Sequence, residues 1–143
     1  MIARAAILAL VCALLGCDGG IIDDDGLDRP AVRGSYRLAG IDGVLPQTLV
    51  SRDGEETYTV HNSQLQVMNF GEYAVTVERT VERSGERRTL TVGGRWLWYG
   101  GDLWFEPRND GCVDEGRWHD DERTIEIVAD CSYGRQWVYQ RWP

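Results

Sequence analysis

The sequence predicts an all-β domain in which eight to nine antiparallel strands form an up-and-down meander and close into a small barrel. Three observations support this prediction. From Gly34 onward, apolar and polar residues alternate with a period of two. Turn-forming pairs that contain glycine separate the alternating segments at even intervals. No segment has the 3.6-residue period of an amphipathic helix.

Residues 71–83 give the clearest strand pattern. One face carries Tyr73, Val75, Val77 and Val81. The opposite face carries the polar residues Glu72, Thr76, Glu78, Thr80 and Glu82. This alternation is typical of a strand with one buried face.

The other expected strands follow the same pattern. They cover residues 35–41, 57–62, 64–70, 88–92, 95–100, 102–105, 112–119, 124–128 and 135–142. The turn signals between them are Asp42-Gly43, Asp53-Gly54, Ser84-Gly85, Gly93-Gly94, Gly100-Gly101, Asn109-Asp110-Gly111 and Ser132-Tyr133-Gly134. Gly93-Gly94 is either a turn or a bend inside one long strand. A closed barrel of about eight strands is filled by side chains or holds one small ligand.

Residues 1–16 have the order of an export signal. Arg4 precedes an apolar run from Ala5 to Leu15, which is too short to cross a bilayer, because a spanning helix needs about 20 residues. The segment Leu14-Leu15-Gly16-Cys17 resembles the lipobox of bacterial lipoproteins. That resemblance implies cleavage before Cys17 and acylation of its thiol and amino group. The alternative is a plain signal peptide or anchor helix in which Cys17 has no role.

A lipidated Cys17 defines the expected domain organisation. Residues 1–16 are the signal peptide, residues 17–33 carry the lipid and form a flexible acidic tether, and residues 34–143 form the barrel. Two or three acyl chains, at about 0.8 kcal/mol per buried methylene, would hold the protein at a membrane. The aspartates at 23–25 lack the ligand spacing of an EF-hand and are expected to be solvated.

Cys12 is expected to be lost with the signal peptide, so Cys112 and Cys131 are the remaining pair in an exported and therefore oxidising setting, which favours a disulfide. Their separation excludes a Cys-x-x-Cys redox pair, and the sequence offers too few companion ligands for a zinc site. Closing a loop of this length should stabilise the domain by about 3 kcal/mol.

The charge disfavours two kinds of partner. The chain has 15 Arg and no Lys against 23 acidic residues, and loss of Arg4 with the signal would change the net charge from −8 to −9. Nucleic acids and anionic lipid surfaces would repel such a protein. The lipobox resemblance implies a place in the bacterial cell envelope, facing the periplasm or the exterior, and we expect a monomer.

Several short motifs resemble the bacterial lipocalin-like domains. The opening motif is Gly34-Ser35-Tyr36-Arg37-Leu38, followed by Ile41-Asp42-Gly43 and Leu45-Pro46. Later motifs are Leu65-x-Val67 before Gly71-x-Tyr73, then Leu103-x-Phe105-x-Pro107, and finally Tyr139-x-Arg141. The resemblance implies an eight-stranded up-and-down barrel and no enzymatic activity. The sequence departs from lipocalins proper at Tyr36, where they have a tryptophan, and it has no evident C-terminal helix.

Aromatic residues on the inward faces are the expected ligand-binding wall. They are Tyr36, Tyr58, Tyr73, Trp96, Trp98, Phe105, Trp118, Trp137 and Tyr139. The sequence thus predicts a membrane-tethered binding module for a small apolar or amphipathic molecule. In the alternative, these rings fill the barrel, and its surface acts as a protein-interaction or inhibitor module in the periplasm.

Catalytic and metal chemistry have little support. His61 and His119 are expected in solvated turns, and no His-x-His or His-Glu-x-x-His spacing suggests a metal site. There is no Gly-x-Ser-x-Gly motif for a serine nucleophile. Asp114 and Glu115 could pair as acid and base, although an acidic chain brings some carboxylates together by chance. The sequence therefore predicts neither an enzyme nor a cofactor.

Overall fold

A computed structural model describes residues 31–51, 53–108, 111–129 and 135–143. These residues form nine strands and one turn of 3-10 helix, η1 (Asn69–Gly71), and within these ranges no helix is long and apolar enough to cross a membrane. The strands are β1 (Gly34–Ile41), β2 (Gln47–Val50), β3 (Thr57–Val67), β4 (Glu72–Val81), β5 (Glu86–Tyr99), β6 (Asp102–Pro107), β7 (Asp114–His119), β8 (Thr124–Ala129) and β9 (Arg135–Arg141). The predicted all-β fold is confirmed.

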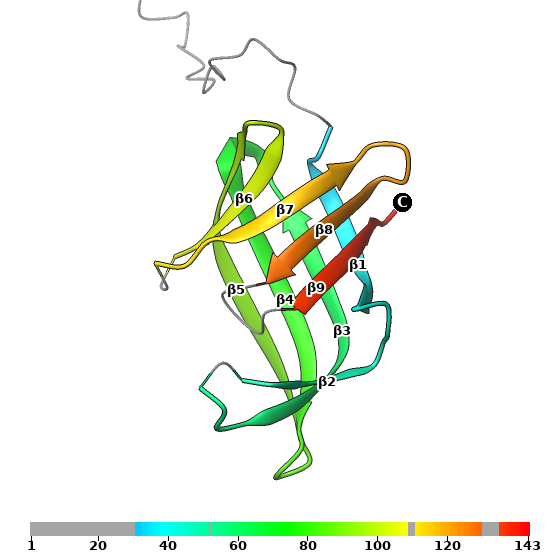
Figure 1. Cartoon of the computed structure of the whole chain (residues 1–143), viewed down its shortest axis with the longest axis vertical. Coiled ribbons are helices and arrows are strands. Elements are labelled where there is room, and N and C mark those ends of the chain that lie inside the picture. Colours follow the sequence, from blue (N-terminus) through cyan, green and yellow to red (C-terminus); the bar gives the residue numbers. More distant parts are fainter. Residues whose placement is uncertain (1–30, 52, 109–110, 130–134) are drawn as a thin grey trace, which may run out of the picture.

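The sheet closes because β1 pairs with two strands. It runs antiparallel to β9 on one side and to β3 on the other, so that eight antiparallel strands form a barrel (Figure 1). The ninth strand, β2, pairs with the first part of β3, on the same edge where β1 pairs with the last part. Arg37 of β1 is opposite Gln64, and Gln47 of β2 is opposite Val60. The short β2 had not been predicted.

Two pairs of predicted strands are single strands in the structure. The segments 57–62 and 64–70 join in β3, with an irregularity between Val60 and Asn62. The segments 88–92 and 95–100 join in β5, so that the two glycines lie inside one strand. A Cβ atom on Gly94 would be 2.0 Å from the Glu106 carbonyl oxygen. Only glycine allows β6 to approach β5 this closely.

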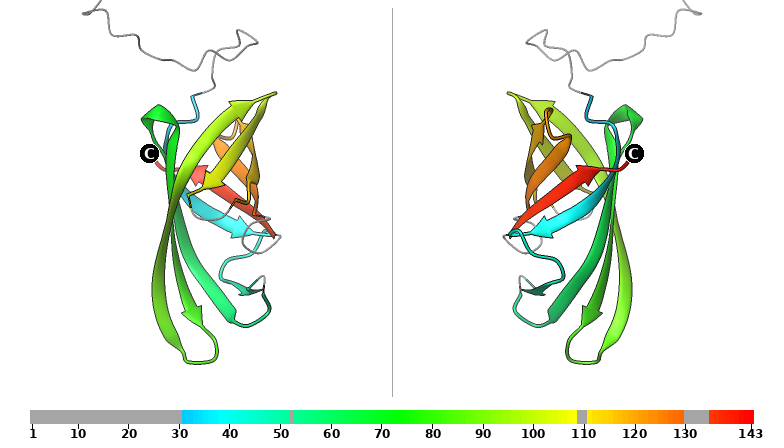
Figure 2. Two further views of the ribbon diagram at one scale, coloured as in Figure 1. Left: turned by 90° about the vertical axis from the view of Figure 1, so that its left-hand side faces the viewer. Right: turned by 90° about the vertical axis from the view of Figure 1, so that its right-hand side faces the viewer.

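The strands have unequal lengths, and this leaves part of the barrel open. β5 pairs with β4 along Glu86–Arg95, but with β6 only from Gly94 to Tyr99. The hairpin of β4 and β5 therefore extends beyond β6, as Figure 2 shows. We call the end that carries the β4–β5 hairpin the lower end of the barrel. The upper end carries the start of β1, the turns β3–β4, β5–β6 and β7–β8, and the end of β9 (Figure 1).

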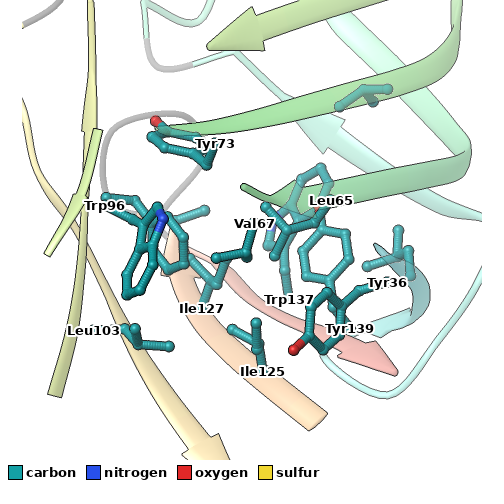
Figure 3. Packing of buried hydrophobic residues seen from close by; sticks show 14 of the residues in the cluster. Tyr36, Leu65, Val67, Tyr73, Trp96, Leu103, Ile125, Ile127, Trp137 and Tyr139 are labelled. Carbon is teal, nitrogen blue, oxygen red and sulfur yellow. The ribbon is translucent and has the colours of Figure 1, made fainter. Parts of the chain in front are cut away.

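The core lies between the inward faces of the strands. Its largest fully buried side chains include Phe105 and, as labelled in Figure 3, Tyr36, Tyr139, Leu65 and Ile125. In β4, Tyr73, Val77 and Val81 are buried, as the alternating pattern predicted. Val32 is also completely buried, so the packed part of the chain begins before Gly34.

Candidate functional site

A cavity of about 110 Å³ lies in the lower half of the barrel, between β4–β5 and the strands β6 to β9. Most of its lining is apolar. The lining residues are Tyr73, Val75, Val77, Arg79, Leu90, Val92, Phe105, Pro107, Asp114, Ile127, Ala129, Trp137 and Tyr139. The cavity is only partly enclosed, because β6 stops where β5 continues downward.

The lining becomes polar toward the lower end. Along β4 the inward residues are Tyr73, Val75 and Val77, and then Arg79. Opposite Val77 on β5 is Leu90, which is 41% exposed. The Arg79 guanidinium lies over the ring of Tyr58, 3.8 Å from the ring centre. A positive charge therefore follows the apolar stretch of the wall.

Asp114 adds a carboxylate to the lining. It begins β7, where it is opposite Phe105. Burial raises the pKa of Tyr73 and of Tyr139, and the negative charge of Asp114 raises both further. The cavity thus combines apolar walls with a few polar groups, two phenols, a carboxylate and a guanidinium, as small-molecule sites do.

Four of the nine predicted wall residues line the cavity. Tyr73 and Phe105 meet edge to face with their ring centres 5.1 Å apart, and Trp137 stacks on Tyr139 at 6.3 Å. These four aromatic residues come from three strands, β4, β6 and β9, so the wall is built by the closed barrel rather than by one hairpin.

The other five predicted residues lie elsewhere in the interior. Tyr36, Tyr58 and Trp96 are buried, and Trp98 and Trp118 are half-buried against the core. Tyr36 packs edge to face against Trp118, with ring centres 6.1 Å apart. These rings fill the barrel away from the cavity.

Sequence reasoning missed the aliphatic and charged part of the lining. Val75 and Val77 share the alternating face with Tyr73, so the signal was present in the strand pattern. Asp114 had been considered only as a catalytic carboxylate. Arg79 lies between Val77 and Val81 on the same alternating face, so its inward place could also have been predicted from the strand pattern.

The size of the cavity restricts what it can hold. Sites that enclose a drug-sized ligand measure roughly 300–1,000 Å³. An apolar cavity of roughly 150 Å³ is large enough for benzene. The space of about 110 Å³ is therefore suited to one small apolar group, such as a ring or a short branched chain, with the rest of the ligand outside.

The two histidines belong to strands, so the prediction that both lie in turns was wrong. His61 is inside β3, and its Nε2 lies 2.8 Å from the Thr80 hydroxyl. His119 ends β7, with its Nε2 2.9 Å from a carboxylate oxygen of Glu126. In the ranges that the structure covers, no three His, Cys, Asp or Glu side chains gather as metal ligands. Cys17 and Cys131 lie outside the described residues.

Comparison with known proteins adds no relative. No protein-family model, curated protein or solved structure matches the chain.

Proposed function

We propose that the protein is a membrane-tethered, non-enzymatic binding module of the bacterial cell envelope, whose barrel receives the apolar group of a small amphipathic molecule. The observation that carries this proposal is the apolar cavity of about 110 Å³ that ends in a charged rim. A rigid aromatic and aliphatic wall offers shape complementarity to an apolar group, and the rim can hold a polar head near water.

The charges of the rim restrict the class of ligand. Arg79 follows the apolar stretch of β4 at the lower end, whereas Asp114 belongs to β7, so an anionic head group would lie on the β4 side, near the guanidinium and away from the carboxylate. The preferred ligand is then an acid with an aromatic or short branched tail. A long acyl chain would not fit into a space of this size.

Tryptophan fluorescence tests ligand binding directly, because Trp137 belongs to the cavity wall. The chain without its lipid anchor would be titrated with phenyl-substituted short carboxylic acids, with their uncharged alcohols and with a long-chain fatty acid. We expect saturable changes in emission with the short acids, weaker ones with the alcohols and none with the long chain.

A matched pair of variants locates the binding site. Ala129→Leu places a larger side chain in the cavity and should abolish binding. Ala74→Leu makes the same substitution on the outward face of another strand, β4, and should leave binding intact. If the two variants bind alike, or if the wild-type protein binds no amphiphile, the ligand proposal fails.

The membrane tether has its own test. Cys17→Ser should block lipidation, so that a palmitate analogue supplied to cells labels the wild-type protein and not the variant. Equal labelling of the two proteins, or no labelling of either, would contradict an anchor at Cys17.

One observation favours a second candidate function, a surface module that binds a protein. In the described part of the chain, Glu86–Val92 of β5 pairs with β4 on one side and with no strand on the other. The last bond on that side runs from the Arg108 amide to the Gly93 carbonyl, 3.1 Å long. An open strand edge can accept an extended segment of a partner. Thr91→Pro removes an amide from this edge and would abolish such binding, while amphiphile binding would persist.

A further inference from the structure

The upper end of the barrel exposes aromatic side chains. Among the described residues, the large aromatics that are exposed are Phe70 (92%), Tyr99 (78%) and Trp142 (50%). Phe70 follows β3, Tyr99 ends β5, and Trp142 follows β9. All three therefore lie at the upper end, with Met68, which is 38% exposed. We call these four residues the aromatic end.

The backbone around Phe70 holds its ring outward. Phe70 has a φ of 62°, in the left-handed region that bulky residues rarely adopt. The turn is fixed on both sides, because the Met68 amide donates to the Glu72 carbonyl at 2.8 Å and the Trp96 indole donates to the Met68 carbonyl at 3.0 Å. A strained and almost fully exposed phenylalanine gains nothing from the core, which points to a contact outside the molecule.

The chain enters the barrel at this same end. Val32 is completely buried, and its carbonyl accepts a hydrogen bond from the Tyr36 hydroxyl. The Arg141 guanidinium donates to the Ala31 carbonyl at 3.0 Å and to the Arg33 carbonyl at 2.6 Å. A shallow hollow lined by Arg33, Met68 and Phe70 lies beside this point. The described chain therefore begins, at Ala31, in a fixed position at the upper end.

We propose that the aromatic end docks on the surface of the lipid bilayer to which the chain is anchored. This inference rests on the lipid anchor at Cys17 proposed above. Between that residue and Ala31 the chain could span on the order of 50 Å when extended, and a flexible chain of this length averages about 20 Å. Tryptophan, tyrosine and phenylalanine favour the boundary between head groups and acyl chains. The bilayer is thus the apolar surface nearest to these side chains.

Because the chain is anchored, a weak contact between the aromatic end and the bilayer is sufficient for docking. Four side chains alone bind a bilayer poorly, but the flexible tether that the sequence predicts would raise the effective concentration to the millimolar range. Docking would turn the upper end toward the lipid and leave the cavity at the lower end facing the aqueous space. Acidic residues of the β7–β8 turn (Asp120, Asp121 and Glu122) and the arginines Arg33 and Arg141 all lie at the upper end, so the contact would depend on the apolar side chains. Because the chain has a net charge of −8, anionic lipids should weaken this contact rather than strengthen it.

Quenching by brominated lipid tests the proposal with a matched pair of reporters. The lipidated full chain would carry Phe70→Trp at the aromatic end, or Val44→Trp, which replaces an exposed side chain at the lower end. Each protein would be reconstituted in phosphatidylcholine vesicles with and without bromine on the acyl chains. We expect the added tryptophan to increase quenching over wild type in Phe70→Trp only, and the increase should become smaller when phosphatidylglycerol is included.

Vesicle flotation separates failure of docking from failure of the anchor. A protein that does not float with the vesicles has no anchor, and the proposed tether fails with it. A protein that floats but shows equal quenching for the two reporters keeps its anchor and overturns the docking proposal. Emission of Phe70→Trp that changes with protein concentration and not with bromination would instead indicate that a second copy covers the aromatic end, which also overturns the proposal.

Discussion

The hydroxyl oxygen of Tyr139 lies 2.9 Å from that of Ser63 inside the barrel. The two residues belong to β9 and β3, which are separated in the sheet by β1. Ser63 is 1% exposed and Tyr139 is 2% exposed, so neither hydroxyl can reach bulk water. This hydrogen bond satisfies two buried polar groups at the place where the barrel closes. The Tyr139 ring also lines the cavity.

We expect Ser63→Ala to lower the free energy of unfolding by about 1–3 kcal/mol, because the Tyr139 hydroxyl would lose its partner in an apolar site. Removing both hydroxyls, in Ser63→Ala combined with Tyr139→Phe, should cost less than the sum of the single changes. Denaturant unfolding of the four proteins measures this coupling. Strictly additive effects would show that the hydrogen bond contributes nothing.

Two neighbouring glycines should respond differently to the same substitution. Gly94→Ala would bring a methyl group to 2.0 Å from the Glu106 carbonyl oxygen and 2.8 Å from the Tyr73 ring. We expect it to destabilise the fold by about 3 kcal/mol or more. The control is Gly93→Ala, where the nearest atom is 3.4 Å away and a small effect is expected. Similar melting temperatures for the two variants would contradict the close approach of β5 and β6.

Three buried tyrosines, Tyr36, Tyr73 and Tyr139, should titrate at high pH. Burial raises the pKa of Tyr36 to about 12, against a smaller opposing effect of Arg141, and burial also raises the pKa of Tyr73 and Tyr139. A raised pKa means that the folded state favours the neutral phenol. The resulting stability is complete below a pH of about 10, the unfolded pKa, and is lost as the pH rises through the folded values. Phenolate absorbance of the folded protein should show these three groups titrating late, and titration of all tyrosines near pH 10 would refute it.

The disulfide between Cys112 and Cys131 stays a prediction, because Cys131 lies outside the described residues. We expect no free thiol at either position when the non-reduced protein is unfolded and treated with a thiol reagent. Reduction should lower the free energy of unfolding by about 3 kcal/mol. Two reactive thiols at these positions would rule out the bridge.

The sequence revealed which residues face inward more clearly than how the strands meet. Alternation placed Tyr73 and Val77 on one buried face, because strand geometry is local. It could not tell whether Gly93-Gly94 was a turn, since the answer depends on the Glu106 carbonyl of another strand. Likewise, closure through β1 depends on contacts between residues far apart in the chain.

The cavity was less predictable than the fold. Aromatic content suggested its wall, and Tyr73, Phe105, Trp137 and Tyr139 do line it. Most of the other rings pack in the core, because bulky side chains also serve to fill a small barrel. The volume that remains is set by how β4 and β5 diverge from β6, which no periodicity in the sequence encodes.

Nuclear magnetic resonance of the methyl groups tests the central claim most directly. Isoleucine, leucine and valine methyls would be observed while a phenyl-substituted short carboxylic acid is added. Binding in the cavity predicts saturable shifts at Val75, Val77, Val92 and Ile127, with contacts between ligand and methyl protons, while Val50 and Val128 on the outside stay unchanged. Shifts confined to outer residues, or no shifts at any concentration, would contradict the account of this barrel as a binding module.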